Sequence, residues 1–214
     1  MPGRSGLWAA LVVSSVLSAC TGATGPASPA ASKPSHGLSQ APTSSASPPS
    51  SSAAPPSSSA PAGVRVDRPW ATATLIDVTT GDPFRIADLV ASGKVVFLET
   101  MAIWCSNCRA QQVEATTAFE ELDPEQVVWV AIDVESSETA EALARYREQN
   151  AFPFTYAIAD ADYARALVAD FGDIVLSPPS VNIIAIGTDG RVTHLRGHKN
   201  ADELRRLAAE HGAT

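Results

Sequence analysis

Cysteine is scarce in this chain, which has only three among its 214 residues. Beside the pair Cys105 and Cys108 there is no second Cys pair, and the histidines beyond residue 62 all fall in the last predicted strand and helix: His194, His198 and His211. A structural zinc site takes four ligands. The sequence therefore disfavours a zinc site at the Cys pair, and we expect no metal.

Acidic residues are missing from the first part of the chain. Residues 1–62 carry Arg4 and Lys33 but no Asp or Glu. All 23 acidic residues therefore lie in residues 63–214, together with 13 of the 15 basic residues, so that this part has a formal net charge of −10. Because an acidic domain repels phosphate backbones, we expect no nucleic acid among the partners.

The apolar run near the N-terminus, Leu7 to Leu17, is shorter than the roughly 20 residues that a transmembrane helix needs. It follows Arg4 and ends in small residues, as an export signal does. We therefore expect a signal peptide over residues 1–19. The Cys that follows resembles the lipobox of bacterial lipoproteins, which implies cleavage before Cys20 and lipidation of its thiol. An ordinary signal peptide with an incidental Cys and a retained membrane anchor are the alternatives.

Residues 21–62 are almost wholly Ser, Pro, Ala, Thr and Gly. Such a composition offers no apolar surface to bury. We therefore expect the lipidated Cys and the segment after it, residues 20–62, to form a disordered tether. A segment that binds a proline-recognising partner is the alternative. The folded domain is expected over residues 63–214.

The domain alternates apolar runs with helical patterns. We expect strands over residues 70–78, 84–86, 95–98, 127–134, 154–158, 181–186 and 191–195, and helices over 87–89, 109–122, 138–150, 161–171 and 203–211. Strands separated by helices favour a parallel core with helices on both faces. The turn signal at residues 188–190 adds an antiparallel edge. The sequence thus predicts an α/β domain with a central mixed sheet and an N-terminal β-hairpin.

Cys105 and Cys108 follow a buried strand and begin a helix. Unpaired N–H groups at a helix N-terminus favour a thiolate. The spacing puts Cys108 on the same face as Cys105, close enough for a disulfide. This arrangement predicts that Cys105 attacks a substrate disulfide and that Cys108 resolves the mixed disulfide. Half a zinc site, a structural disulfide and two free thiols are the alternatives.

Residues 68–211 resemble the thioredoxin fold, and within it the exported, membrane-anchored TlpA/ResA-like thiol–disulfide oxidoreductases. The matching segments are Leu75–Leu89, Gly93–Leu98, Trp104-Cys-Ser-Asn-Cys-Arg109, Val128–Val134, Pro178–Ser180 and Thr188–Arg191. The resemblance implies a protein-disulfide reductase with a redox-active Cys105–Cys108 disulfide. Such an enzyme needs neither a metal nor an organic cofactor, because its electrons reside in the thiols.

The resemblance also assigns two residues next to the pair. Glu99, six residues before Cys105, stands where the thioredoxin family commonly has a buried acid, which implies that it takes the proton from Cys108. A surface Glu at a strand end is the alternative. Trp104 is expected to shield the disulfide and to offer a flat contact surface, with simple core packing as the alternative.

A proline facing the pair is the third feature that the resemblance implies. Pro179 or Pro178 is expected to supply a cis-proline, and Pro179 followed by Ser180 fits the family pattern best. A cis proline exposes a backbone edge with which an extended substrate peptide can pair. An ordinary trans turn is the alternative.

The expected partners also follow from the resemblance. Electrons would come from an integral-membrane thiol carrier, and the substrates would be apocytochrome c or other exported proteins, at the extracytoplasmic face of a bacterial membrane. Ser106-Asn107 departs from the family's frequent Pro-containing dipeptides, which leaves the direction of electron flow open. A disulfide-forming oxidase of the same fold is therefore one alternative, and an anchored binding module with a structural disulfide is another.

Overall fold

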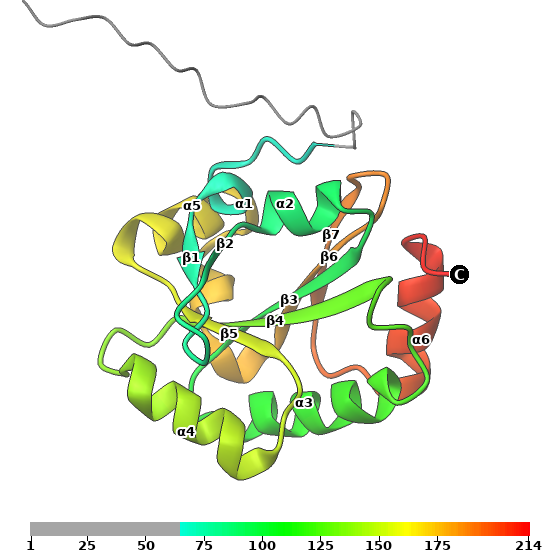
Figure 1. Ribbon diagram of the computed structural model, residues 1–214. Coiled ribbons are helices and arrows are strands. Elements are labelled where there is room, and N and C mark those ends of the chain that lie inside the picture. Colours follow the sequence, from blue (N-terminus) through cyan, green and yellow to red (C-terminus); the bar gives the residue numbers. More distant parts are fainter. Residues whose placement is uncertain (1–64) are drawn as a thin grey trace, which may run out of the picture. The chain divides into compact units, whose positions relative to one another are not determined.

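The computed structural model describes residues 65–214 (Figure 1). The predicted signal peptide over residues 1–19, the lipidation site Cys20 and the tether over residues 20–62 lie outside the described residues. So does the expected start of the domain at residue 63. Within residues 65–214, no helix combines the length and the apolar character that crossing a membrane requires.

A five-stranded mixed sheet with the order β5-β4-β3-β6-β7 forms the centre of the domain (Figure 1). Its strands are β3 (Val95–Met101), β4 (Val127–Asp133), β5 (Thr155–Ile158), β6 (Asn182–Ile186) and β7 (Val192–Arg196). β4 pairs in parallel with β3 and with β5, whereas β6 pairs antiparallel with β3 and with β7. The predicted parallel core with an antiparallel edge is confirmed.

Helices cover both faces of this sheet, as predicted, because alternate residues of each strand point to opposite faces. Phe97 and its neighbours on one face pack against α3 (Ser106–Phe119), α4 (Ala140–Asn150) and α6 (Ala201–Glu210). Val96 and Leu98 on the other face pack against α1 (Pro69–Thr72), α2 (Ile86–Ala91) and α5 (Ala161–Phe171). All seven residues of β3 are buried, which is typical of a strand covered on both faces.

The N-terminal part of the domain differs from the prediction in one respect. β1 (Leu75–Ile76) and β2 (Pro83–Phe84) form the expected antiparallel hairpin. Of the strand expected over residues 70–78, however, only Leu75–Ile76 forms, because residues 69–72 form the helix α1. Proline suits the first position of a helix, and Trp70 is fully buried, with its indole N–H donating to Asp170 of α5 at 2.7 Å. Tertiary packing of this Trp therefore overrides the strand-like pattern.

Two short 3-10 helices, η1 (Asp173–Leu176) and η2 (Pro178–Ser180), connect α5 to β6. The sequence predicted no element here. Asn182 at the start of β6 holds this connection, because its side-chain amide donates to the carbonyl of Ile174 at 2.8 Å. The connection places η2 against α3, the helix that begins at the Cys pair.

Candidate active site

A disulfide joins Cys105 and Cys108 at the N-terminus of α3, with 5.3 Å between their Cα atoms. Cys105 is the N-cap of α3, and its Sγ accepts a hydrogen bond from the backbone N–H of Cys108 at 3.1 Å. That N–H is one of the donors that a helix start leaves without a partner in the helix. The same donor, with the helix dipole, favours negative charge on the Cys105 sulfur when the disulfide is open.

The surroundings of the disulfide differ on its two sides. Cys108 is fully buried and Cys105 is 2% exposed. Cys105 lines an open surface hollow together with Trp104, Arg109, Val113 and His198, among others. Trp104 is 58% exposed and its indole N–H donates to Glu135 at 3.3 Å. This exposure excludes simple core packing for Trp104, while its role as a contact surface stays a prediction.

The predicted prolines lie beside the Cys pair. Sγ of Cys108 is 3.3 Å from the carbonyl oxygen of Pro178, and the side-chain amide of Asn107 donates to the carbonyl of Pro179 at 3.0 Å. Pro178 is buried, whereas Pro179 is exposed. The hydroxyl of Ser180 donates to Ser177 at 3.3 Å, within its own loop. The cis isomer, and the choice between the two prolines, stay predictions.

The backbone that follows Pro178 and Pro179 is hydrogen-bonded to Gly197, the residue after β7. The backbone N–H of Gly197 lies between the carbonyls of Val181 and Ser180, at 2.9 and 3.2 Å. Val181 has a φ of 45°, which a β-branched residue rarely adopts. Its own N–H donates to Pro178 at 3.0 Å. Backbone strain of this kind is often found at functional sites, where the surrounding structure maintains it.

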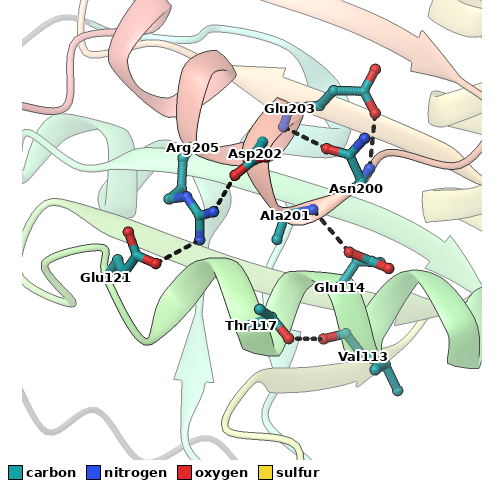
Figure 2. Close-up of polar contacts among 9 residues, drawn as sticks. All are labelled: Val113, Glu114, Thr117, Glu121, Asn200, Ala201, Asp202, Glu203 and Arg205. Carbon is teal, nitrogen blue, oxygen red and sulfur yellow. Dashed lines mark hydrogen bonds and ion pairs between the residues drawn. The ribbon is translucent and has the colours of Figure 1, made fainter.

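The loop before α6 is fastened to α3 near the surface hollow. Gln111 exchanges two hydrogen bonds with the backbone of Lys199, at 3.0 and 2.7 Å. Figure 2 shows the next contact, in which the backbone N–H of Ala201 donates to Glu114 of α3 at 2.9 Å. These contacts hold the neighbouring His198 at the hollow that Cys105 lines.

Glu99 is fully buried in β3, which excludes the surface position that was the alternative. Its Oε2 accepts hydrogen bonds from the side-chain amide of Gln112 at 2.9 Å and from the indole of Trp129 at 3.2 Å. Its Oε1 has no partner among the described residues. Burial raises the pKa of Glu99 to about 8, although the two hydrogen bonds lower it. Its role as the proton acceptor stays a prediction.

Gln112 connects Glu99 to the rest of the domain, and no role was predicted for it. It lies four residues beyond Cys108 on the same face of α3, so the bond to Gln112 places Glu99 beneath the first turns of that helix. The amide oxygen of Gln112 accepts hydrogen bonds from the hydroxyls of Tyr156 at 2.8 Å and Tyr146 at 3.2 Å. α3 buries two glutamines, Gln111 and Gln112, beside Cys108, Ala115 and Ala118, and no apolar periodicity in the sequence marks either of them.

Three carboxyl side chains beside the loop before Trp104 were also not predicted: those of Asp133, Glu135 and Glu138. Glu138 accepts hydrogen bonds from the backbone N–H of Ile103 at 2.8 and 3.1 Å, and Asp133 accepts one from the N–H of Glu135 at 2.8 Å. Burial, together with a hydrogen bond to Glu138, raises the pKa of Asp133 well above its usual range. The structure groups no three His, Cys, Asp or Glu side chains of residues 65–214 so that they could hold a metal ion.

Solved structures similar to this domain have the thioredoxin fold. A thioredoxin-family thiol:disulfide interchange protein from Chlorobium tepidum aligns with a TM-score of 0.56 at 17% identity, over 70% of this chain and 96% of its own. A secreted Mycobacterium tuberculosis disulfide oxidoreductase homologous to E. coli DsbE aligns with 0.52 at 21% identity, over 66% and 97%. The exposed lipoprotein thioredoxin Etrx1 of Streptococcus pneumoniae aligns with 0.51 at 17% identity, over 64% and 98%.

No family model and no curated protein matches the chain. The likeness to solved structures, all at low identity, shows the fold. The predicted thioredoxin fold, with its central mixed sheet and helices on both faces, is therefore confirmed.

Proposed function

We propose that this thioredoxin-fold chain is a thiol–disulfide oxidoreductase and that Cys105 and Cys108 are its redox centre. One observation carries the proposal: the disulfide lies at the N-terminus of α3, where the sulfur of Cys105 accepts the N–H of Cys108. A purely structural disulfide has no need of such a donor. A loop this short also constrains the unfolded chain little, so the bond adds little stability.

The chemistry follows from the two positions. In the reduced protein, the Cys105 thiolate attacks one sulfur of a substrate disulfide, and the other substrate sulfur leaves as a thiolate. Cys108 then attacks Cys105, which re-forms the Cys105–Cys108 disulfide and releases the second substrate thiolate. Two electrons pass from the Cys pair to the substrate. The thiol proton of Cys108 must be removed for this second attack, and we assign its removal to Glu99.

The proposed place of action is the extracytoplasmic face of a bacterial membrane, with the chain anchored by a lipid on Cys20. The sequence of residues 1–20 supports this proposal. Among the proteins with this fold, one is named as secreted and another as an exposed lipoprotein. Labelling of the chain by a radioactive fatty acid, and loss of the label in Cys20→Ser, would test the anchor.

We further propose that the chain works as a reductase. An integral-membrane thiol carrier would supply electrons, and exported proteins such as apocytochrome c would receive them. The resemblance to TlpA/ResA-like proteins in the active-site segments supports this direction.

A trapping experiment tests the oxidoreductase itself. In Cys108→Ala the resolving thiol is absent, so Cys105 should accumulate mixed disulfides that appear on a non-reducing gel and vanish with reductant. Cys105→Ala with Cys108 retained is the matched control, and it should trap almost nothing because Cys108 is fully buried and, unlike Cys105, does not line the surface hollow. Wild-type protein should also reduce insulin. A Cys108→Ala chain that forms no adducts, together with a wild type that leaves insulin intact, would contradict the proposal.

The reduction potential of the Cys pair tests the direction. Disulfide reductases of this chemistry have potentials below about −200 mV, and strong oxidases lie well above that value. We expect the lower range. A potential well above it would identify a disulfide-forming oxidase instead.

A further inference from the structure

Two tyrosine hydroxyls meet at the same atom in the buried core beneath the Cys pair. Tyr146 of α4 and Tyr156 of β5 both donate to the amide oxygen of Gln112, at 3.2 and 2.8 Å. Burial raises the pKa of both tyrosines, so both keep their protons and remain donors. Two donors at one end of an amide fix which end is the oxygen.

The orientation of this amide determines whether Gln112 presents a hydrogen-bond donor or an acceptor to Glu99. With its oxygen held by the tyrosines, Gln112 must point its NH₂ group at Glu99, where it donates to Oε2 at 2.9 Å. Trp129 donates to the same oxygen at 3.2 Å, and an indole N–H can only donate. Oε2 is therefore occupied by two donors. Oε1, which is buried, has no partner among the described residues.

We propose that Gln112 is a positioning residue that selects which oxygen of Glu99 takes up a proton. Because Oε2 already accepts two N–H groups, the proton goes to Oε1. This inference deepens the proposed function and rests on it for its role in turnover. In the resolving step, the S–H proton of Cys108 passes to Oε1 while the Cys108 sulfur bonds to Cys105. The bond from Cys105 to the substrate breaks, and the substrate leaves as a thiolate.

The groups that surround Glu99 on each neighbouring element determine whether its carboxyl is protonated. Gln112 lies on α3, and Cys108 lies one turn earlier on the same helix. Trp129 lies on β4, and the apolar Ile183 of β6 is the residue paired with Glu99 in the sheet. The tyrosines come from α4 and β5, and Arg109 and Glu138 act on Tyr146. Among the described residues, no ionised group forms a salt bridge with Glu99. Its protonation is therefore governed by burial and by the two N–H donors.

The experiment is an NMR titration of Glu99 in the oxidised full-length chain, with ¹³C-labelled Glu and ¹⁵N-labelled Gln. In the wild type, the side-chain NH₂ signals of Gln112 should move with the same midpoint as the Glu99 carboxyl. In the Tyr146→Phe/Tyr156→Phe double variant, Gln112 is free to turn its oxygen toward Glu99, which favours the protonated carboxyl. The midpoint should then rise by about one pH unit, the size expected for losing a hydrogen bond to a charged group.

Tyr163→Phe is the matched control. Tyr163 is the third tyrosine of the chain and is also buried, but it packs on the opposite face of the sheet, and its hydroxyl has no partner within residues 65–214. Its removal should leave the Glu99 midpoint and the Gln112 signals unchanged. The single variant Tyr156→Phe, which loses the shorter bond, should shift the midpoint in the same direction as the double variant and serves if the double variant does not fold.

An unchanged midpoint in the double variant, or an equal shift in Tyr163→Phe, would overturn the inference. The titration uses oxidised protein without substrate, so its outcome does not depend on enzyme activity. If Glu99 responds as expected but Cys108→Ala traps nothing, the positioning role of Gln112 stands and the oxidoreductase proposal falls. If trapping succeeds and the titration fails, the reverse holds.

Discussion

The two cysteines of the disulfide have different surroundings, which support the different roles proposed for them. Cys105 lines the surface hollow and accepts an N–H, whereas Cys108 is fully buried and its Sγ lies 3.3 Å from the carbonyl oxygen of Pro178 in η2. A bulky substrate disulfide can reach only the exposed side of such a pair. These surroundings support the proposal that Cys105 meets the substrate and that Cys108 needs an internal proton acceptor.

At the residue scale, Glu99→Gln should slow the resolving step at neutral pH by about 100-fold, the usual size of general-base catalysis. Because Glu99 has a pKa of about 8, the wild-type rate should rise as the pH passes through that value and the carboxylate forms. The variant should approach the wild type only at higher pH, where Cys108 ionises without help. Release of a coloured aromatic thiol from a mixed disulfide on Cys105 measures this step.

The control for this experiment is Glu120→Gln, which makes the same chemical change on an exposed side chain at the end of α3. It should leave the rate and its pH profile unchanged. Equal rates in Glu99→Gln and the wild type at pH 7 would show that another group accepts the proton.

Cys105, Cys108 and Glu99 were predicted from the sequence as candidate site residues, but the hydrogen-bond network around Glu99 was not predicted. Glu99 was named through the resemblance to the thioredoxin family, which commonly has a buried acid six residues before the first Cys. Gln112 could not be given a role in the same way. Its two tyrosine partners lie 34 and 44 residues away in the sequence, and only the packing of α4 and β5 brings them together.

At the scale of elements, the long buried strands and amphipathic helices were predictable because their pattern repeats over many residues. Short elements were not. α1 has four residues and η2 has three, so neither offers a periodicity to detect. The start of α3 was placed at Arg109, three residues late, because Ser106, Asn107 and Cys108 add no apolar positions to the helical pattern.

α6 offers a test at this scale, because its N-terminus is fastened to α3 (Figure 2). Asn200 caps the helix, accepting from the N–H of Glu203 at 2.9 Å, while the Glu203 side chain accepts from the N–H of Asn200 at 2.9 Å. Asn200→Ala should lower the free energy of unfolding by about 1 kcal/mol, measured by urea denaturation.

The exposed Glu210 at the other end of the same helix provides the control for the cap. A negative charge at a helix C-terminus opposes the helix dipole, so Glu210→Ala should change the stability by less than about 0.5 kcal/mol, in the stabilising direction. A loss in Glu210→Ala as large as that in Asn200→Ala would show that the cap itself is unimportant.

At the scale of the whole molecule, two acidic side chains are buried in one small domain without a cationic partner. Glu99 lies in β3 and Asp133 at the end of the adjacent β4, and burial raises the pKa of both. A structure that only needed stability would gain by replacing such groups with apolar side chains, because burying an ionised carboxylate is costly. Glu99, which lies beneath the first turns of α3, fits the proposal that some stability is given up for proton transfer.

The pH dependence of stability should reveal this cost. Glu99 has a pKa of about 8 in the folded protein against 4.5 as the ordinary value. Between these values the folded state holds a proton that the unfolded state has lost, so stability falls as the pH rises and reaches its full cost above pH 8. Glu99 alone should contribute a slope of up to about 1.4 kcal/mol per pH unit in this window. Asp133 acts in the same direction.

Urea unfolding of the oxidised protein from pH 5 to pH 8 measures that slope. Glu99→Gln mimics the protonated carboxyl at every pH, so its stability should fall less steeply, and its gain over the wild type should grow toward pH 8. Glu125→Gln, which alters a carboxylate whose side chain is 88% exposed, should reproduce the wild-type slope. Parallel curves for Glu99→Gln and the wild type would mean that Glu99 titrates near its ordinary value. A buried proton acceptor for Cys108 would then have to be sought elsewhere, with Asp133 as the next group to test.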